Sequence, residues 1–229
     1  MKKIATTFAL LVLCATSAFS ANAVRISQVY GGGGGSTGTY LFDYIELFNS
    51  SGSAVSIGGW SLQYGSATGT SFGSAATNIA NIPAGVAIAP CSYYLIQCSA
   101  AGSAGSAFPV TPDLVSTGPS MSATVGKLAL INNQVGANAC SGNTSGAIYV
   151  DVVGYGTGNC FETTAAGALT STQAAVRNGG GMADTDVNSA DFTVAANPVP
   201  RNSQSSQNVD CLATPSSNDT WGHVKSLYR

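Results

Sequence analysis

Two short runs of alternating apolar and polar residues stand near the start of the chain, and five consecutive glycines lie between them. Residues 24–30 read VRISQVY and residues 44–48 read YIELF. A side-chain period of two is typical of a β-strand with one face on a core, so the first run is expected to be half-buried. The glycines at 31–35 cannot continue a strand and are expected to form a flexible loop. This pattern predicts two β-strands separated by a glycine-rich loop.

The same signal recurs along most of the chain. Alternating or apolar runs, bounded by Gly, Asn and Pro turns, are found at residues 54–57, 60–64, 86–88, 93–96, 128–131, 148–153, 174–177 and 192–194. Strands at this spacing predict a β-sandwich. Helices do not alternate with the strands, which argues against an α/β fold. Residues 100–124, rich in Gly, Ser, Ala and Pro, are expected to form a long surface loop, because the strand pattern resumes after them.

The first 23 residues have the features of a secretory signal peptide. Lys2 and Lys3 precede an apolar run at residues 4–13, and small residues follow at 21–23. Cleavage between Ala23 and Val24 is therefore expected. The mature protein is then secreted or held at the cell surface.

A lipoprotein interpretation would use Cys14 as the lipid-bearing residue. Leu13 precedes it and is bulky where a small residue is normally needed, so this alternative is less favoured. No other apolar run approaches the roughly 18 residues that a membrane-spanning helix needs. The sequence therefore predicts no transmembrane segment.

The charge balance disfavours nucleic acid as a partner. Charged residues make up 8% of the chain, and cleavage before Val24 would leave six basic residues against ten acidic ones. The basic residues are scattered, apart from two near the C-terminus. Such a surface does not attract a polyanion by bulk electrostatics.

Five cysteines would remain after cleavage, and export favours their oxidation to disulfides. Because five is odd, at least one is unpaired or pairs between chains. Cys91 and Cys98 flank an expected strand of roughly 23 Å, far beyond the Cα separation of about 7 Å that a disulfide allows. We favour a bridge between Cys140 and Cys160, which flank another strand. Zinc is disfavoured because the chain has no closely spaced cysteine pair.

Ten segments, taken in order, resemble the bacterial lamin-tail domain of exported proteins. They are VRISQVYGGGG, DYIELFN, GWSLQYGSATGTSF, IPAG, SYYLIQ, KLALIN, YVDVVGYGTGNCFE, AAVRNGGG, DTDVNSADF and PVPRNS. The resemblance implies an all-β, immunoglobulin-like β-sandwich over residues 24–203. Residues 1–23 then form the signal peptide, and residues 204–229 form a linker with a short helical tail.

The resemblance also bears on one cysteine. Bacterial members of the family often carry a cysteine just before the DTD motif and another after PRNS. Here Met182 occupies the first position, while Cys211 remains. This departure implies that Cys211 is the unpaired thiol.

A calcium loop is the candidate metal site. Asp184, Asp186 and Asn188 place oxygen-bearing side chains at alternate positions, as calcium loops do. The segment lacks the glycine and the bidentate glutamate of the full motif. The alternative is a turn whose Asp and Asn side chains bond to their own backbone, with Asp184 or Asp186 paired to Arg177.

No catalytic constellation accompanies the fold, so the chain is expected not to be an enzyme. Glu46 on the second strand is expected to face solvent or to anchor a neighbouring loop. The only histidine, His223, lies in the tail and has no G-x-S-x-G context. The ten acidic residues are too dispersed to favour metal-dependent phosphodiester hydrolysis.

Three functions remain open. The first is an exported, non-catalytic module that binds a protein or polysaccharide at the cell surface. The second is a structural or accessory protein of the cell envelope, attached through its tail, where Trp221, Val224 and Leu227 fall on one helical stripe. The third, less favoured, is an accessory to a metal-dependent phosphoesterase or nuclease.

Overall fold

The computed structural model describes residues 22–137 and 148–212. Its strands are β1 (Val24–Tyr30), β2 (Asp43–Asn49), β3 (Val55–Ser56), β4 (Ser61–Gly65), β5 (Ile79–Asn81), β6 (Ala87–Ile88), β7 (Tyr93–Cys98), β8 (Leu114–Val115), β9 (Gly126–Ile131), β10 (Tyr149–Tyr155), β11 (Gln173–Arg177) and β12 (Phe192–Ala196). The helical turns are η1 (Ala76–Asn78), η2 (Gly179–Gly181), α1 (Asn188–Asp191) and α2 (Val209–Leu212).

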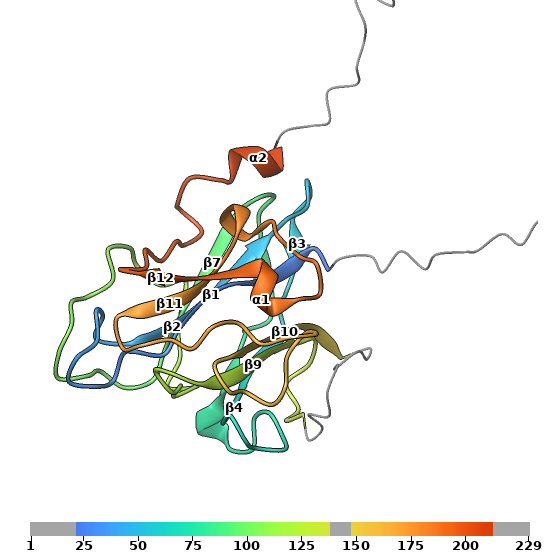
Figure 1. The fold of residues 1–229 in the computed structure, drawn as a ribbon. Coiled ribbons are helices and arrows are strands. Elements are labelled where there is room, and N and C mark those ends of the chain that lie inside the picture. Colours follow the sequence, from blue (N-terminus) through green and yellow to red (C-terminus); the bar gives the residue numbers. More distant parts are fainter. Residues whose placement is uncertain (1–21, 138–147, 213–229) are drawn as a thin grey trace, which may run out of the picture.

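Two sheets pack face to face (Figure 1). The large sheet has the order β12-β11-β1-β2-β7-β8, and the small sheet has the order β10-β9-β4-β5. All pairs in them are antiparallel except β7 with β8. Strands β3 and β6 form a separate antiparallel pair. The expected all-β sandwich is confirmed.

The core lies between the two sheets. Ile26 and Leu47 of the large sheet and Leu62, Leu128 and Val153 of the small sheet belong to one cluster of fully or almost fully buried side chains. Burying a side chain of this size stabilises the fold by roughly 1.5–3 kcal/mol. The alternation seen in the sequence thus places one side of each strand in this core.

Strand β1 differs from expectation, because all seven of its residues are buried. A bulge between Ile26 and Gln28 shifts the register against β2, which returns Val29 to the core. The outer side of the strand is also covered, since Tyr30 belongs to an aromatic cluster with Tyr40 and Tyr44. The half-buried prediction was wrong because a further layer of chain lies outside the large sheet.

The loop predicted at residues 100–124 supplies part of that layer. Its Phe108 ring packs against Tyr40 and Tyr44, with centroids 5.3 and 5.5 Å away. The C-terminal segment, residues 197–212, supplies the rest, and the Tyr40 hydroxyl donates to the Pro198 carbonyl at 2.8 Å. The large sheet is therefore covered on both faces over β1 and β2.

The glycine run serves close packing more than flexibility. Gly31 and Gly32 are buried. A Cβ on Gly32 would collide with the Ser171 carbonyl, and one on Gly33 would collide with the Phe42 backbone. At these two positions a side chain has no room, which explains why the sequence places glycine there.

Candidate functional site

An ion network closes one end of the sandwich, and Arg177 stands at its centre. The Arg177 side chain is fully buried, and its Nη2 lies 2.7 Å from the Asp151 carboxylate on β10. Its Nε donates to the Ile26 carbonyl at 2.8 Å, and its Nη1 lies 3.3 Å from Asp184. The guanidinium also stacks 4.5 Å from the centre of the Phe192 ring. One side chain thus ties β1, β10, β11 and β12 together.

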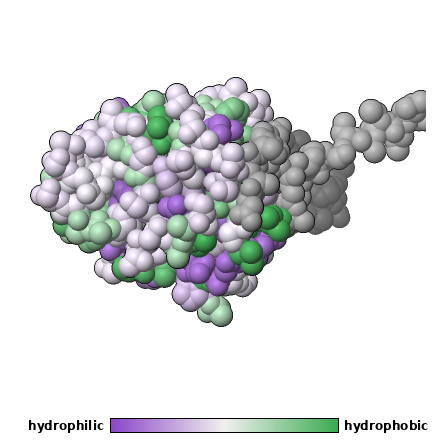
Figure 2. Space-filling model, turned by 90° about the horizontal axis from the view of Figure 1, so that it is seen from below, coloured by the Kyte–Doolittle hydropathy of each residue, from purple (hydrophilic) through white to green (hydrophobic). Residues whose placement is uncertain are grey.

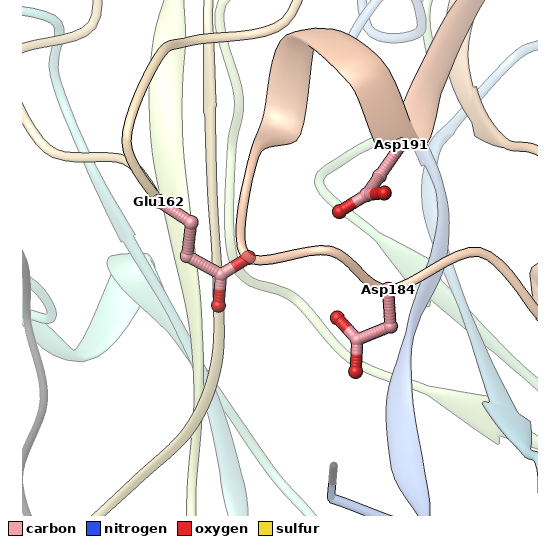
Figure 3. Close-up of side chains that lie close together, drawn as sticks. All are labelled: Glu162, Asp184 and Asp191. Atoms are coloured by element: carbon pink, nitrogen blue, oxygen red, sulfur yellow. The ribbon is translucent and has the colours of Figure 1, made fainter. Parts of the chain in front are cut away.

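Three carboxylates face one another beside this arginine (Figure 3). One ligand oxygen from each of Glu162, Asp184 and Asp191 lies within 4.8 Å of the others. Asp191 accepts hydrogen bonds from the backbone N–H and the hydroxyl of Thr185, both at 2.9 Å. These are the only three His, Cys, Asp or Glu side chains in the described ranges that converge closely enough to hold a metal ion.

Two guanidinium groups already compensate the negative charge of this cluster. Arg177 contacts Asp184 and Asp191, the latter at 3.8 Å, and Arg25 lies 3.4 Å from Asp184. Burial raises the pKa of Glu162 to about 9, and the negative charge of Asp151 adds to the shift. Burial also raises the pKa of Asp184, against the pull of both arginines. The geometry is that of a largely paired ion network at this end of the sandwich, in which the buried Nε of Arg25 is left without a hydrogen-bond partner among the described residues.

The predicted calcium loop maps only in part onto this cluster. Asp184 belongs to it and contacts Arg177, as the turn alternative expected. Asp186 is exposed and lies outside the group. The Asn188 amide is occupied, because it accepts from the Gly154 N–H at 2.9 Å and donates to the Val152 carbonyl at 3.0 Å. The Asn188 side chain thus makes the hydrogen bonds to β10 that a neighbouring strand would otherwise make. Its side-chain oxygen already accepts hydrogen bonds from two backbone N–H groups, and calcium binding at Asp184, Asp186 and Asn188 stays a prediction.

Glu162 predicts a pH dependence of stability. Its pKa rises from 4.5 to about 9 on folding, so at intermediate pH the folded chain holds a proton that the unfolded chain has lost. The free energy of unfolding should therefore fall as the pH rises toward 9. Glu162→Gln imitates the protonated acid and should be more stable than wild type at pH 9 and similar to it at pH 5. Urea unfolding at both pH values measures this, and equal curves for the two proteins at pH 9 would contradict it.

The disulfide pattern corrects one prediction. Cys211 is not unpaired, because it bridges Cys91 with a Cα separation of 5.6 Å. The free and buried thiol in the described part of the chain is Cys98. Cys91 and Cys98 do not pair with each other, as expected. Cys160 is disulfide-bonded, but Cys140 lies outside the described residues, so the Cys140–Cys160 bridge stays a prediction.

The C-terminal segment is fixed to the domain well beyond residue 203. Arg201 pairs with the fully buried Glu46 at 2.7 Å and stacks on Tyr93, with the guanidinium 3.7 Å from the ring centre. Asn208 donates to the Gly179 carbonyl at 2.9 Å. The part of the expected linker that the structure describes therefore lies on the sandwich. The expected tail stripe at residues 221–227 lies outside the described residues.

Sequence reasoning did not find the Glu46–Arg201 pair. Burial raises the pKa of Glu46, and the Arg201 guanidinium opposes this shift. Ser27 and Gln28 also donate to the Glu46 carboxylate, at 2.6 and 3.0 Å. Glu46 therefore anchors a neighbouring segment, which was one of the two expectations for it. The motifs DYIELFN and PVPRNS contain the partners, but nothing in either motif indicates that they meet.

An open groove of about 580 Å³ lies on the outer face of the large sheet. Its floor includes Gln28, Val176, Thr193 and Ala195, and its walls include residues 178–180, 197–199 and Arg201. Both arginines that line it, Arg177 and Arg201, are paired with carboxylates. None of the twelve lining residues is Asp, Glu, His, Cys or Lys. The groove thus offers amide, hydroxyl and apolar groups without a general acid or base.

The face of the molecule seen from below has no large apolar patch (Figure 2). The residues drawn in colour there are mostly pale, and the green ones are scattered among them without forming one large apolar patch. Among the described residues, no helix is long and apolar enough to cross a membrane. The groove is a wide, open hollow in the described surface.

The two packed, mainly antiparallel sheets define an immunoglobulin-like β-sandwich. The family model described as Lamin Tail Domain matches residues 17–157, which is more than half of the chain, and the chain belongs to this family. This confirms the resemblance drawn from the sequence.

One solved structure supports the fold. The crystal structure of a DUF4876 family protein from Bacteroides thetaiotaomicron shares 13% sequence identity with the chain, at a TM-score of 0.54. The match covers 82% of this chain and 74% of that one. At this identity the likeness shows the fold alone. No curated protein matches the chain.

Proposed function

We propose that the chain is an exported, non-catalytic lamin-tail module that binds a protein or polysaccharide at the cell surface through the groove on the large sheet. The observation that carries this proposal is the composition of the groove. Gln28, Asn178 and Thr193 supply hydrogen-bonding groups, and Val176 and Val199 supply apolar contacts. This mixture is typical of recognition sites, and it contains no side chain that could transfer a proton at neutral pH.

The wall of the groove is held rigidly, as a binding site requires. Arg201 is fixed by Glu46 and Tyr93. The Val199 carbonyl accepts from Gln28 at 3.0 Å, and the Asn197 N–H donates to the Thr172 carbonyl at 3.3 Å. The Cys91–Cys211 bridge holds the chain after this wall. The groove is therefore formed before any ligand arrives.

Export is supported by the N-terminal sequence and by oxidised cysteines. Disulfides are typical of proteins outside the cytoplasm, and Cys91–Cys211 is one. Strand β1 begins at Val24, so the expected cleavage before Val24 would leave every strand whole and would remove the hydrogen bonds that the Ala23 carbonyl accepts from Ser50. N-terminal sequencing of exported material tests the site, and a lipid-modified Cys14 would overturn it.

A groove-filling variant tests the binding surface. Thr193 is exposed on the groove floor, and Thr193→Trp would place a large ring there. We expect this change to weaken binding by about tenfold or more, as a bulky group in the middle of an interface does. Binding of labelled protein to glycan and protein arrays measures the effect.

The matched control is Val135→Trp. Val135 is 72% exposed and is not a lining residue of the groove. The Val135→Trp variant adds the same ring outside the groove and should leave every array signal within about twofold of the wild-type signal. Equal signals from wild type and Thr193→Trp would reject the groove as the binding surface.

The envelope-accessory alternative is favoured by one observation. The Cys91–Cys211 bridge anchors the chain to the domain just before residues 213–229. A force applied to the tail would therefore be transmitted to the sandwich through this bridge. Deleting residues 221–229 would then move the protein from the envelope to the soluble fraction. An unchanged distribution would rule this alternative out.

A further inference from the structure

Strand β12 is the outermost strand of the large sheet, and one of its edges has no partner strand (Figure 1). The hydrogen bonds on either side of the β11–β12 ladder fix its phase. The Asn178 N–H donates to the Asp191 carbonyl at 2.8 Å, and the Asn197 N–H donates to the Thr172 carbonyl at 3.3 Å. Because hydrogen-bonded pairs alternate in an antiparallel ladder, Thr193 and Ala195 face β11 with their backbone groups.

The backbone groups of the alternate residues point away from β11. These are the N–H and carbonyl groups of Phe192, Val194 and Ala196. The Phe192 N–H is already bonded, to the Asn188 carbonyl. Among the described residues, the other five groups, two donors and three acceptors, have no hydrogen-bond partner. They form a short, open row of donors and acceptors.

The other sheet edges in the described ranges are protected. Asn188 bonds along β10 with its side-chain amide, at Val152 and Gly154. The loop at 118–120 lies beside η1 and the start of β5, where the Ser120 N–H donates to the Thr77 carbonyl at 3.3 Å and Gly118 lies close to the Ile79 carbonyl. Strands β3, β6 and β8 have only two residues each. Proteins usually block an edge with a charge, a proline or a bulge, and β12, with the sequence FTVAA and a regular register, has none of them.

We propose that the free edge of β12 pairs antiparallel with β12 of a second copy of this chain. An antiparallel pairing centred on Val194 sets Val194 against its own copy and Phe192 against Ala196. The two donors of each copy then meet the Phe192 and Val194 carbonyls of the other copy, and four hydrogen bonds form. The edge carries no charge that would repel its copy. This self-complementarity favours a second copy over an unrelated strand, and it does not depend on what the groove binds.

Substitutions at Ala196 test the pairing. Ala196→Pro removes an outward N–H and leaves the ladder with β11 intact, since proline is tolerated where its nitrogen faces away from the sheet. Ala196→Gly keeps the N–H at the same position. We expect wild type and Ala196→Gly to dimerise between about 5 and 200 μM, a range that covers typical weak interfaces. Ala196→Pro should raise the dimer dissociation constant by about tenfold or more, since two of the four bonds are lost.

Analytical ultracentrifugation of the mature chain gives the masses, and circular dichroism shows that each variant is folded. Hydrogen exchange of the wild type provides a readout without mutation, because the amides of Val194 and Ala196 should gain protection as the concentration rises. A wild type that stays monomeric throughout, or an Ala196→Pro variant that dimerises equally well, would overturn the proposal. Concentration-independent exchange at both amides would do the same.

Discussion

Replacing Arg177 with alanine should lower the free energy of unfolding by about 3–5 kcal/mol, which is roughly 10 °C in melting temperature for a chain of this size. The reason is the charge that would remain. Asp151 and Asp191 are buried, and both would lose the cation they contact. The carbonyl of Ile26 would also lose its donor. A buried carboxylate without a partner is far less stable than a paired one.

A double mutant separates charge from packing. Arg177→Met keeps much of the side-chain volume, and Asp151→Asn removes the strongest partner charge. If unpaired charge causes most of the loss, the free energy of unfolding of the double mutant should be at least about 1 kcal/mol higher than the sum of the two single-mutant effects predicts. Thermal unfolding followed by circular dichroism gives the values. A loss below about 1 kcal/mol for Arg177→Ala would show that water reaches this network and that it contributes little.

Removing the Cys91–Cys211 bridge should have the second largest effect. The bridge joins residues 120 positions apart, and a loop of this length is strongly constrained in the unfolded chain. We expect the double variant Cys91→Ser, Cys211→Ser to lose about 2–4 kcal/mol in urea unfolding. Residues 203–208 should also become accessible to a protease, because the chain after Arg201 would be held by hydrogen bonds alone.

The control for this experiment is Cys98→Ala, which changes a buried cysteine outside any bridge. It should leave the protease pattern unchanged. Non-reducing peptide mapping must also join Cys91 to Cys211 in the wild type. A map that joined Cys211 to another cysteine, or a double variant within about 0.5 kcal/mol of wild type, would contradict the structure.

The sequence predicted the strands well, because a period of two is a local signal. The two polar residues between Ile26 and Val29 mark the bulge in β1, which a strict period of two does not predict. The burial of both faces of β1 could not be predicted from this local signal. Its burial depends on Phe108 and on residues 197–212, which are distant in sequence.

The site was harder to predict, because its pairs are long-range. Glu46 and Arg201 are 155 positions apart, and Cys91 and Cys211 are 120 apart. The spacing of Asp184, Asp186 and Asn188 suggested a calcium loop, but the fold turns Asn188 toward β10 and brings Glu162 in instead. Local spacing carries no information about which sheet edge a side chain will meet. The contact of Asp184 with Arg177 was expected, since the two lie close in sequence.

Binding of labelled protein to the surface of the producing cells tests the central claim most directly. The wild type and Val135→Trp should bind with saturation and to similar levels. Thr193→Trp, with an unchanged melting temperature, should bind about tenfold more weakly or not at all. If Thr193→Trp binds the cells as well as the wild type does, the groove is not the recognition surface and the account is wrong.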